Sequence, residues 1–169
     1  LNPVINTRSF GEAPDPVGRL AAAYVRGLHA GGMLATLKHF PGHGDTDVDS
    51  HLGLPIINHP RERLDAIELA PFRAGLGAGA DAVMIGHIEL PALDPGEFSP
   101  ATLSAPIVTG LLRGEMKFAG LIYTDSMGMG AIAKRLSPGD AAVRAIQAGN
   151  DIVLHSPDDA AAVAAVKAA

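Results

Sequence analysis

Short apolar runs alternate along the chain with longer amphipathic stretches. Four runs are short, apolar on both faces and typical of buried parallel strands: residues 33–37, 81–88, 120–124 and 151–154. Helical patterns lie before, between and after them, at residues 15–29, 61–76, 107–116, 140–147 and 158–169. This alternation predicts an α/β fold with a parallel sheet and helical crossovers.

Two of the predicted helices have a recognisable apolar side. In the helix over residues 15–29 Leu20, Tyr24 and Leu28 recur at fourfold spacing. The helix over residues 61–76 is expected to bury four side chains, those of Leu64, Ile67, Leu69 and Phe72.

One polar segment stands out against this pattern. Residues 38–51 read KHFPGHGDTDVDSH and follow directly on the first apolar run. Ionisable residues are costly to hold at the carboxyl end of a strand, and in parallel α/β proteins that end is where substrates bind. Pro41, Gly42 and Gly44 favour a sharply folded loop over a continuing helix. The segment is therefore the first candidate for chemistry.

The spacing Asp49-Ser50-His51 suggests a carboxylate–imidazole pair within that loop. In extended backbone residues i and i+2 point the same way, so the two side chains can meet. A paired carboxylate fixes the tautomer of a histidine and tunes it as a proton donor near neutrality. A second candidate, Asp125, follows the run 120–124. It is either a helix N-cap or a catalytic carboxylate.

Composition narrows the class of protein. The 169 residues carry a net charge of −5 with no cysteine, and 47% are hydrophobic. Lys and Arg are neither in excess nor clustered, which argues against a nucleic-acid partner. No apolar run approaches the roughly 20 residues that span a bilayer. A complete (β/α)₈ barrel takes about 250 residues, and the chain starts without methionine, so we expect part of such a barrel at most.

Three segments together resemble one enzyme family. They are Arg8-Ser9-Phe10-Gly11, the loop Lys38–Gly44 with Asp49-Ser50-His51, and Tyr123–Met129, which reads YTDSMGM. This combination resembles the β-N-acetylhexosaminidases of glycoside hydrolase family 3 (NagZ-like). The resemblance implies a partial TIM-type (β/α) barrel of about four to five parallel strands with outer helices. Residues 1–169 would then be the second part of its catalytic barrel domain.

The resemblance also implies a role for each matched residue. It makes the protein a retaining hydrolase that removes terminal β-linked N-acetylglucosamine from peptidoglycan fragments or chito-oligosaccharides, without metal or cofactor. Asp125 would be the nucleophile, and His51 held by Asp49 the acid/base. The sugar would be bound by Arg8, Lys38 and His39. In a regular strand Lys38 and His39 would point in opposite directions.

Other histidines are assigned less specific roles. His43 is expected to orient the loop by hydrogen bonds. His87 is left open between substrate contact and loop support, and His155 is left unassigned.

Several alternatives remain open at this stage. His43, Asp45, Asp49 and His51 could hold a metal ion, although four ligands from one short loop rarely give tetrahedral geometry. A β-glucosidase-like enzyme, a phosphorolytic enzyme and an inactive fragment of the barrel are the other possibilities. An incomplete barrel would expose valine, isoleucine and leucine on its inner face and self-associate through that edge. The compartment stays open between cytoplasm, which is favoured, and export.

Overall fold

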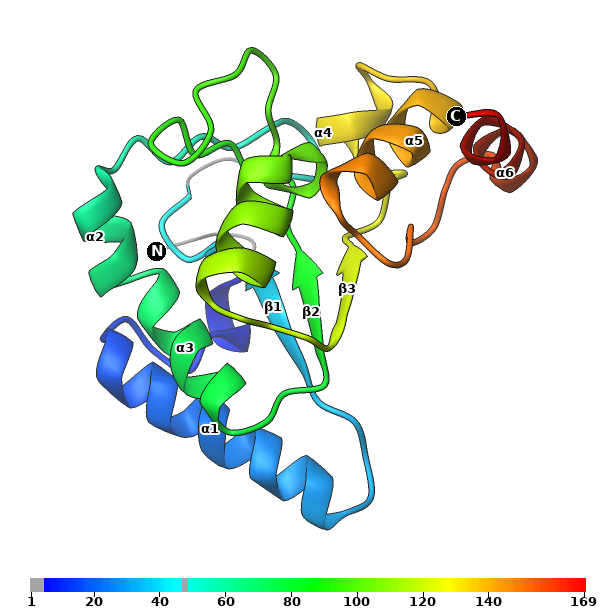
Figure 1. Ribbon diagram of the computed structural model, residues 1–169. Helices are drawn as coiled ribbons and strands as arrows, with labels where there is room; N and C mark the ends of the chain where they lie inside the picture. The colour runs from blue at the N-terminus through cyan, green and yellow to red at the C-terminus, as the bar shows by residue number, and fades with distance from the viewer. Residues whose placement is uncertain (1–4, 47–48) are drawn as a thin grey trace.

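Three parallel strands form the centre of the molecule. The computed structural model describes residues 5–46 and 49–169, and its sheet has the strand order β1–β2–β3 (Figure 1). The strands are β1 (Thr36–Phe40), β2 (Ala82–Ile85) and β3 (Leu121–Thr124). The fourth predicted strand contributes a single parallel bridge, in which Ile152 pairs with Tyr123 of β3. The predicted α/β fold with a parallel sheet is confirmed.

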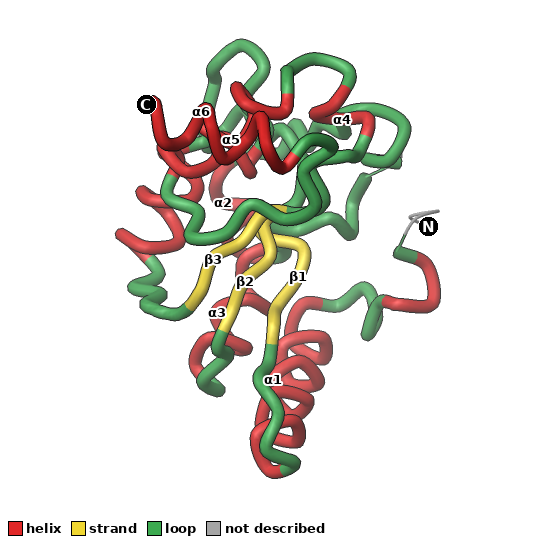
Figure 2. The backbone as a smooth tube through the Cα atoms, turned by 90° about the vertical axis from the view of Figure 1, so that its right-hand side faces the viewer, coloured by secondary structure: helices red, strands yellow, loops and turns green. Residues whose placement is uncertain are grey.

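Helices cover one face of the sheet and the region beyond the carboxyl ends of its strands, while the other face is not covered by a helix of the described residues (Figures 1 and 2). The α-helices are α1 (Pro14–Ala30), α2 (Arg61–Ala66), α3 (Leu69–Gly77), α4 (Gly130–Ala133), α5 (Pro138–Ala148) and α6 (Asp159–Ala168). Two short 3₁₀ turns and one π-type helix complete the fold: η1 (Asn6–Arg8), η2 (Ala101–Leu103) and η3 (Pro106–Glu115). Helices α4, α5 and α6 lie beyond the carboxyl ends of the strands. Those ends are therefore partly covered.

The main core lies between the sheet and helices α1, α3 and η3. Leu37, Val83 and Ile122 are in register across the three strands and are 9% exposed or less. Each such side chain stabilises the fold by about 1.5–3 kcal/mol when it is fully buried. On β1 the ring of Phe40 packs edge-on against Phe72 of α3, with 5.1 Å between the centroids. The sheet is thus attached to the helical layer by its branched aliphatic side chains.

The opposite face of the sheet exposes fewer valine, isoleucine and leucine side chains than expected. Among the described residues it carries Thr36, Lys38 and partly buried Tyr123, with Leu121 50% exposed and Ile152, which pairs with Tyr123, 45% exposed. The reason is the twofold alternation of a strand, because the valine and isoleucine side chains of β2 and β3 point to the helical layer. Self-association through this edge stays a prediction.

Two predicted helices are corrected by the structure. The single helix over 61–76 is interrupted between α2 and α3, because Pro71 has no N–H to donate to the carbonyl of Ile67. In α1 the fourfold series does not mark the buried side, since Leu20 is 49% exposed and Tyr24 is 61% exposed. The buried positions are Gly18 and Val25.

Candidate active site

Asp125 lies where β3 ends, beside the carboxyl ends of the other two strands. Its backbone N–H donates to the carbonyl of Ile85 at the end of β2, 2.9 Å away. Its side chain is 16% exposed. Oδ1 accepts the N–H of Ser126 at 2.7 Å, while Oδ2 lies 3.7 Å from Nε2 of His39. One carboxylate oxygen is held by the backbone, and the other faces His39 at the end of β1, across β2.

His39 reaches Asp125 because β1 is irregular. Leu37 pairs with Val83 and Phe40 pairs with Ile85, so β1 uses one residue more than β2 over this interval. The regular alternation expected for Lys38 and His39 therefore does not hold. The imidazole of His39 is 11% exposed, and its Nδ1 has no hydrogen-bond partner among the residues that the structure describes.

Burial controls the protonation of three histidines around Asp125. Burial lowers the pKa of His39 to about 4, against the opposing effect of the Asp125 carboxylate. Burial also lowers the pKa of His43 and of His87, and Asp125 opposes both shifts. At neutral pH these three imidazoles are therefore uncharged, and the nearby ring of His39, 3.7 Å from Oδ2, leaves the negative charge of Asp125 in place.

Asp49 and His51 form the pair that their spacing predicts. Oδ1 of Asp49 lies 2.8 Å from Nδ1 of His51 and accepts the backbone N–H of His51 at 2.9 Å. That backbone N–H, followed by the ring, lowers the pKa of the Asp49 carboxyl group. The imidazole is 63% exposed. A histidine whose Nδ1 is bound to a carboxylate presents Nε2 outward for proton transfer.

The segment carrying His51 is attached to the segment that follows Asp125. The N–H of Gly130 donates to the carbonyl of His51 at 3.2 Å, and the N–H of Ala131 donates to that of Ser50 at 3.3 Å. A Cβ on Gly130 would lie 2.6 Å from the carbonyl oxygen of His51, so no side chain fits there. The first turn of α4 thus links the two candidate catalytic segments.

His43 supports the same loop from within. It is 4% exposed, with Nδ1 2.7 Å from Oγ1 of Thr46 and Nε2 3.1 Å from Oγ of Ser50. Both contacts are to loop residues, which agrees with the orienting role expected for it. Asp47 and Val48 of the predicted loop lie outside the described residues. Gly42 has a φ of +136° and passes so close to Glu68 that a Cβ would lie 2.8 Å from its side chain.

The two cationic candidates border this edge. Arg8 ends η1, and its charge lowers the pKa values of His39 and His43. Lys38 is exposed on β1 and forms no ion pair within residues 5–46 and 49–169. The structure therefore brings Asp125 and His39 into direct proximity and pairs Asp49 with His51. The charges of Lys38 and Arg8 both lower the pKa of His39, which places these two cations near its ring.

The alternative of a metal site has no geometric support among the described residues. Asp45 lies 2.7 Å from His59, so it is directed away from the Asp49–His51 pair. His43 is engaged with two hydroxyl groups. Within the described part of the chain no three histidine or carboxylate side chains are placed to hold one ion.

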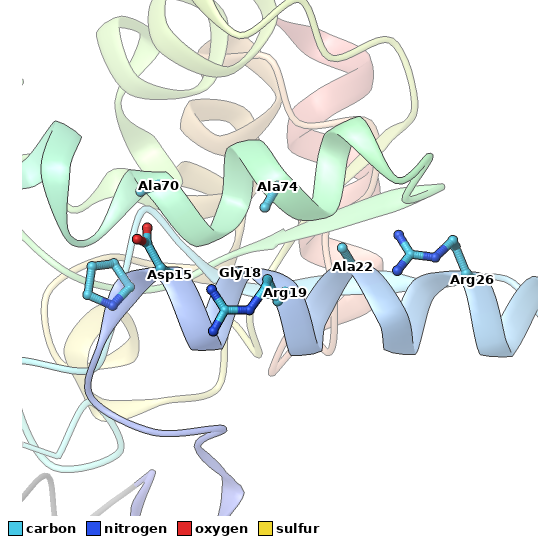
Figure 3. A pocket seen from close by; sticks show the side chains of 8 residues that line it. Asp15, Gly18, Arg19, Ala22, Arg26, Ala70 and Ala74 are labelled. Carbon is cyan, nitrogen blue, oxygen red and sulfur yellow. The ribbon is translucent and has the colours of Figure 1, made fainter.

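A separate groove lies on the outer helical layer. It has a volume of about 440 Å³ and lies between α1 and α3, where Arg19 and Arg26 of α1 border small side chains such as Ala74 (Figure 3). None of its lining residues belongs to the carboxyl edge of the sheet.

Among the described residues no helix is long and apolar enough to cross a membrane.

Near Asp125 the sequence indicates no role for Ser126, leaves His155 unassigned, and leaves His87 open between substrate contact and loop support. Oγ of Ser126 lies 2.7 Å from Nδ1 of His155, and the carbonyl of Ser126 lies 2.9 Å from Nε2 of His87. Their positions at or after strand ends were the available signal, because consecutive parallel strands place such residues side by side.

The fold and the site define the chain as an α/β protein of the barrel-enzyme type, with polar chemistry at the carboxyl edge of parallel strands. The chain belongs to the family described as "Glycosyl hydrolase family 3 N terminal domain", whose model matches residues 1–169.

Three similar proteins show how much of that family the chain represents. It is 44% identical over 163 residues to "Beta-hexosaminidase A" of Pseudoalteromonas piscicida, covering 90% of this chain and 27% of that protein. A glycoside hydrolase family 3 beta-N-acetylglucosaminidase from Paenibacillus sp. str. FPU-7 is 48% identical with a TM-score of 0.95, covering 99% of this chain and 32% of that one. The "Beta-glucoside phosphorylase BglX" is 30% identical with a TM-score of 0.92, covering 99% of this chain and 32% of that one. The chain spans less than a third of each.

Proposed function

We propose that the protein is a retaining β-N-acetylhexosaminidase that removes terminal β-linked N-acetylglucosamine from peptidoglycan fragments or chito-oligosaccharides. One observation carries the proposal: the strand-end carboxylate of Asp125 and the Asp49–His51 pair are joined through the first turn of α4. A retaining glycosidase needs one attacking carboxylate and one group that first donates and then accepts a proton. The resemblance to family 3 β-N-acetylglucosaminidases supports the same assignment.

In the first step Oδ2 of Asp125 attacks the anomeric carbon and displaces the leaving oxygen. His51, as the imidazolium, gives its proton to that oxygen, so the aglycone leaves neutral. The product of this step is a glycosyl ester on Asp125. Oδ2 is suited to the attack because Oδ1 already accepts the N–H of Ser126.

In the second step His51, now neutral, takes a proton from water as the water attacks the anomeric carbon. The bond between that carbon and Asp125 breaks, which regenerates the carboxylate and the imidazolium. The 63% exposure of His51 favours this role, because both the aglycone and water must reach the same nitrogen. Asp49 keeps Nδ1 engaged throughout and thereby directs Nε2 at the substrate.

Sugar binding is assigned to Arg8, Lys38 and His39. The cationic groups donate hydrogen bonds to hydroxyl or carbonyl oxygens of the N-acetyl sugar. His39 is neutral at pH 7, since burial lowers its pKa to about 4, so it donates without weakening the charge of Asp125. We also propose that residues 1–169 form part of a larger parallel barrel, because one face of the sheet carries polar and half-exposed side chains.

The test is the stereochemistry of the first product. The full-length protein would be incubated with 4-nitrophenyl N-acetyl-β-glucosaminide and the released sugar followed by proton NMR. We expect the β-anomer first, with the α-anomer appearing only as the sugar equilibrates. An α-anomer formed first would contradict the retaining mechanism. Faster turnover of the matching 4-nitrophenyl β-glucoside would favour a β-glucosidase.

A phosphorolytic enzyme is the second candidate, supported by the similarity to "Beta-glucoside phosphorylase BglX". In that reaction phosphate replaces water in the second step and takes the sugar as a 1-phosphate. The same assay with and without inorganic phosphate separates the two. A hydrolase releases free N-acetylglucosamine at the same rate in both, whereas a phosphorylase forms sugar 1-phosphate.

A further inference from the structure

Ser126, the residue directly after Asp125, is hydrogen-bonded through each of its polar groups. Its N–H donates to Oδ1 of Asp125 at 2.7 Å. Its carbonyl lies 2.9 Å from Nε2 of His87, and its hydroxyl lies 2.7 Å from Nδ1 of His155. The residue whose N–H binds one oxygen of Asp125 is therefore itself bound by two histidines from neighbouring strand ends, and its carbonyl also accepts the N–H of Met129 at 3.1 Å.

The tautomer of His87 follows from its surroundings. A carbonyl oxygen only accepts, so Nε2 of His87 carries the hydrogen that it donates to Ser126. Burial lowers the pKa of His87, which is 0% exposed, and keeps the ring neutral. Nδ1 then accepts from the hydroxyl of Thr102, 2.7 Å away. The Thr102 hydroxyl also lies 3.0 Å from the carbonyl oxygen of Gly86, so the ring of His87 is connected to Ser126 on one side and to the end of β2 on the other.

His155 reaches Ser126 from the segment next to β3. That segment is fixed by two bonds, from the N–H of Leu154 to Oγ1 of Thr124 at 2.9 Å and from the N–H of Met127 to the carbonyl of Leu154 at 3.0 Å. His155 itself has a φ of 50°, in the left-handed region that few residues other than glycine adopt. Such a conformation is held only where the surroundings determine it.

We infer that Ser126 is a positioning residue for the Asp125 carboxylate, and that His87 and His155 position Ser126. This inference rests on the proposed function, because it explains which oxygen of Asp125 attacks. Oδ1 is occupied by the N–H of Ser126, which leaves Oδ2 directed at the site. Without the two histidines the bond from the N–H of Met129 to the Ser126 carbonyl remains, but the side chain of Ser126 is no longer fixed, so its N–H and the Asp125 carboxylate can shift together.

The inference predicts a loss in kcat with little change in KM. His87→Phe removes the donor to Ser126 but keeps a ring, and should lower kcat about 100-fold, since a displacement near 1 Å costs about that much. His87→Gln keeps an N–H donor close to the place of Nε2 and should recover most of the loss. Ser126→Ala and His155→Phe each break the second contact and should lower kcat about 10-fold. KM should stay within about twofold in all four.

If Ser126, His87 and His155 only stabilised the fold, their substitution would lower the melting temperature without lowering kcat. A matched control variant shows such a purely structural loss. The hydroxyl of Thr109 donates to the carbonyl of Ala148 at 2.8 Å, a bond of the same kind on the outer helices. Thr109→Val should lower the melting temperature and leave kcat unchanged. Ser126→Ala and His155→Phe act at a partly buried and an exposed side chain, so they stay folded even where His87→Phe does not.

The experiment measures kcat, KM and melting temperature for these variants, with Asp125→Asn beside them, all in the full-length protein acting on an aryl N-acetyl-β-glucosaminide. The expected result is a kcat loss in the positioning variants that does not follow the loss in melting temperature, with recovery by His87→Gln. If Asp125→Asn is inactive while Ser126→Ala and His155→Phe match the parent in kcat, the inference is overturned and the proposed function stands. If the parent is inactive, or Asp125→Asn is as active as the parent, the proposed function fails and the inference with it.

Discussion

The two proposed catalytic groups are held in opposite ways. Asp125 is 16% exposed, lies at the end of a paired strand and accepts a backbone N–H. His51 is 63% exposed and sits on a loop whose attachment is through backbone bonds to α4. In the proposed mechanism Asp125 must meet one carbon atom, whereas His51 must serve leaving groups of varied size and then water. The difference indicates that the fold fixes the nucleophile and leaves the proton donor accessible.

The largest loss of activity is expected when Asp125, the shielded one of the two proposed catalytic groups, is replaced. Asp125→Asn keeps the shape and the acceptor for Ser126 but replaces the attacking oxygen or its charge, and should lower kcat by about 10⁴-fold or more. The measurement is steady-state hydrolysis of an aryl N-acetyl-β-glucosaminide, with circular dichroism to confirm an unchanged fold. Activity above a few per cent of the parent would move the nucleophile to another residue.

The next largest effect is expected at the exposed group, and it should depend on the substrate. His51→Ala should lower turnover by about 10²–10⁴-fold on chito-oligosaccharides, whose leaving groups need protonation. On 2,4-dinitrophenyl glycosides, which scarcely need it, the first step should be little affected. Rates for a series of leaving groups give this dependence directly. Equal losses on both kinds of substrate would mean that His51 only shapes the loop.

A smaller loss of activity is expected when the contact between α4 and the loop carrying His51 is disturbed. Gly130→Ala places a Cβ where the carbonyl of His51 now lies, 2.6 Å away, and should displace the loop. We expect a loss of about 10-fold or more that is greater on poor leaving groups, as for His51→Ala. Gly110→Ala is the matched control, because the nearest atom to its Cβ is 3.8 Å away. A loss that is equal on all leaving groups would contradict the link.

The smallest effect is on the free energy of unfolding, and it comes from His39, the neutral imidazole beside Asp125. The unfolded chain protonates His39 near its ordinary pKa of 6.5, whereas the folded protein does so only at about 4. The unfolded state therefore binds more protons between these values, so the free energy of unfolding falls as the pH drops from about 6.5 to about 4 and levels off below. His39→Phe should reduce this fall in the free energy of unfolding, between pH 6.5 and pH 4, by an amount on the order of 1–3 kcal/mol. Urea denaturation at several pH values measures it, and an unchanged slope would show that His39 is protonated in the fold.

Much of the fold and part of the site could be predicted because the signals are local. The apolar runs located β2 and β3, but the first run overlaps only Thr36 and Leu37 of β1, whose last three residues were expected in the loop. The spacing of Asp49 and His51 predicted their hydrogen bond. The break at Pro71 was missed because the apolar periodicity continues across it. The buried side of α1 was missed because it depends on Gly18 meeting α3 rather than on large side chains.

What could not be predicted depends on residues far apart in the chain. The bonds from α4 to the loop join residues about 80 positions apart, and Ser126 and His155 are separated by 29. No pattern within a single element encodes such pairs. The irregular pairing of β1, which brings His39 to Asp125, likewise appears only once β2 is in place.

The central claim is that Asp125 forms the glycosyl ester. The most direct measurement uses a fluorinated N-acetylglucosaminide with an activated leaving group, which forms the ester readily and releases it slowly. After an acid quench and proteolysis, mass spectrometry locates the added sugar. We predict that it is carried by Asp125, and that the Asp125→Asn protein carries none. A sugar on any other carboxylate, or turnover without a trapped ester, would contradict this account.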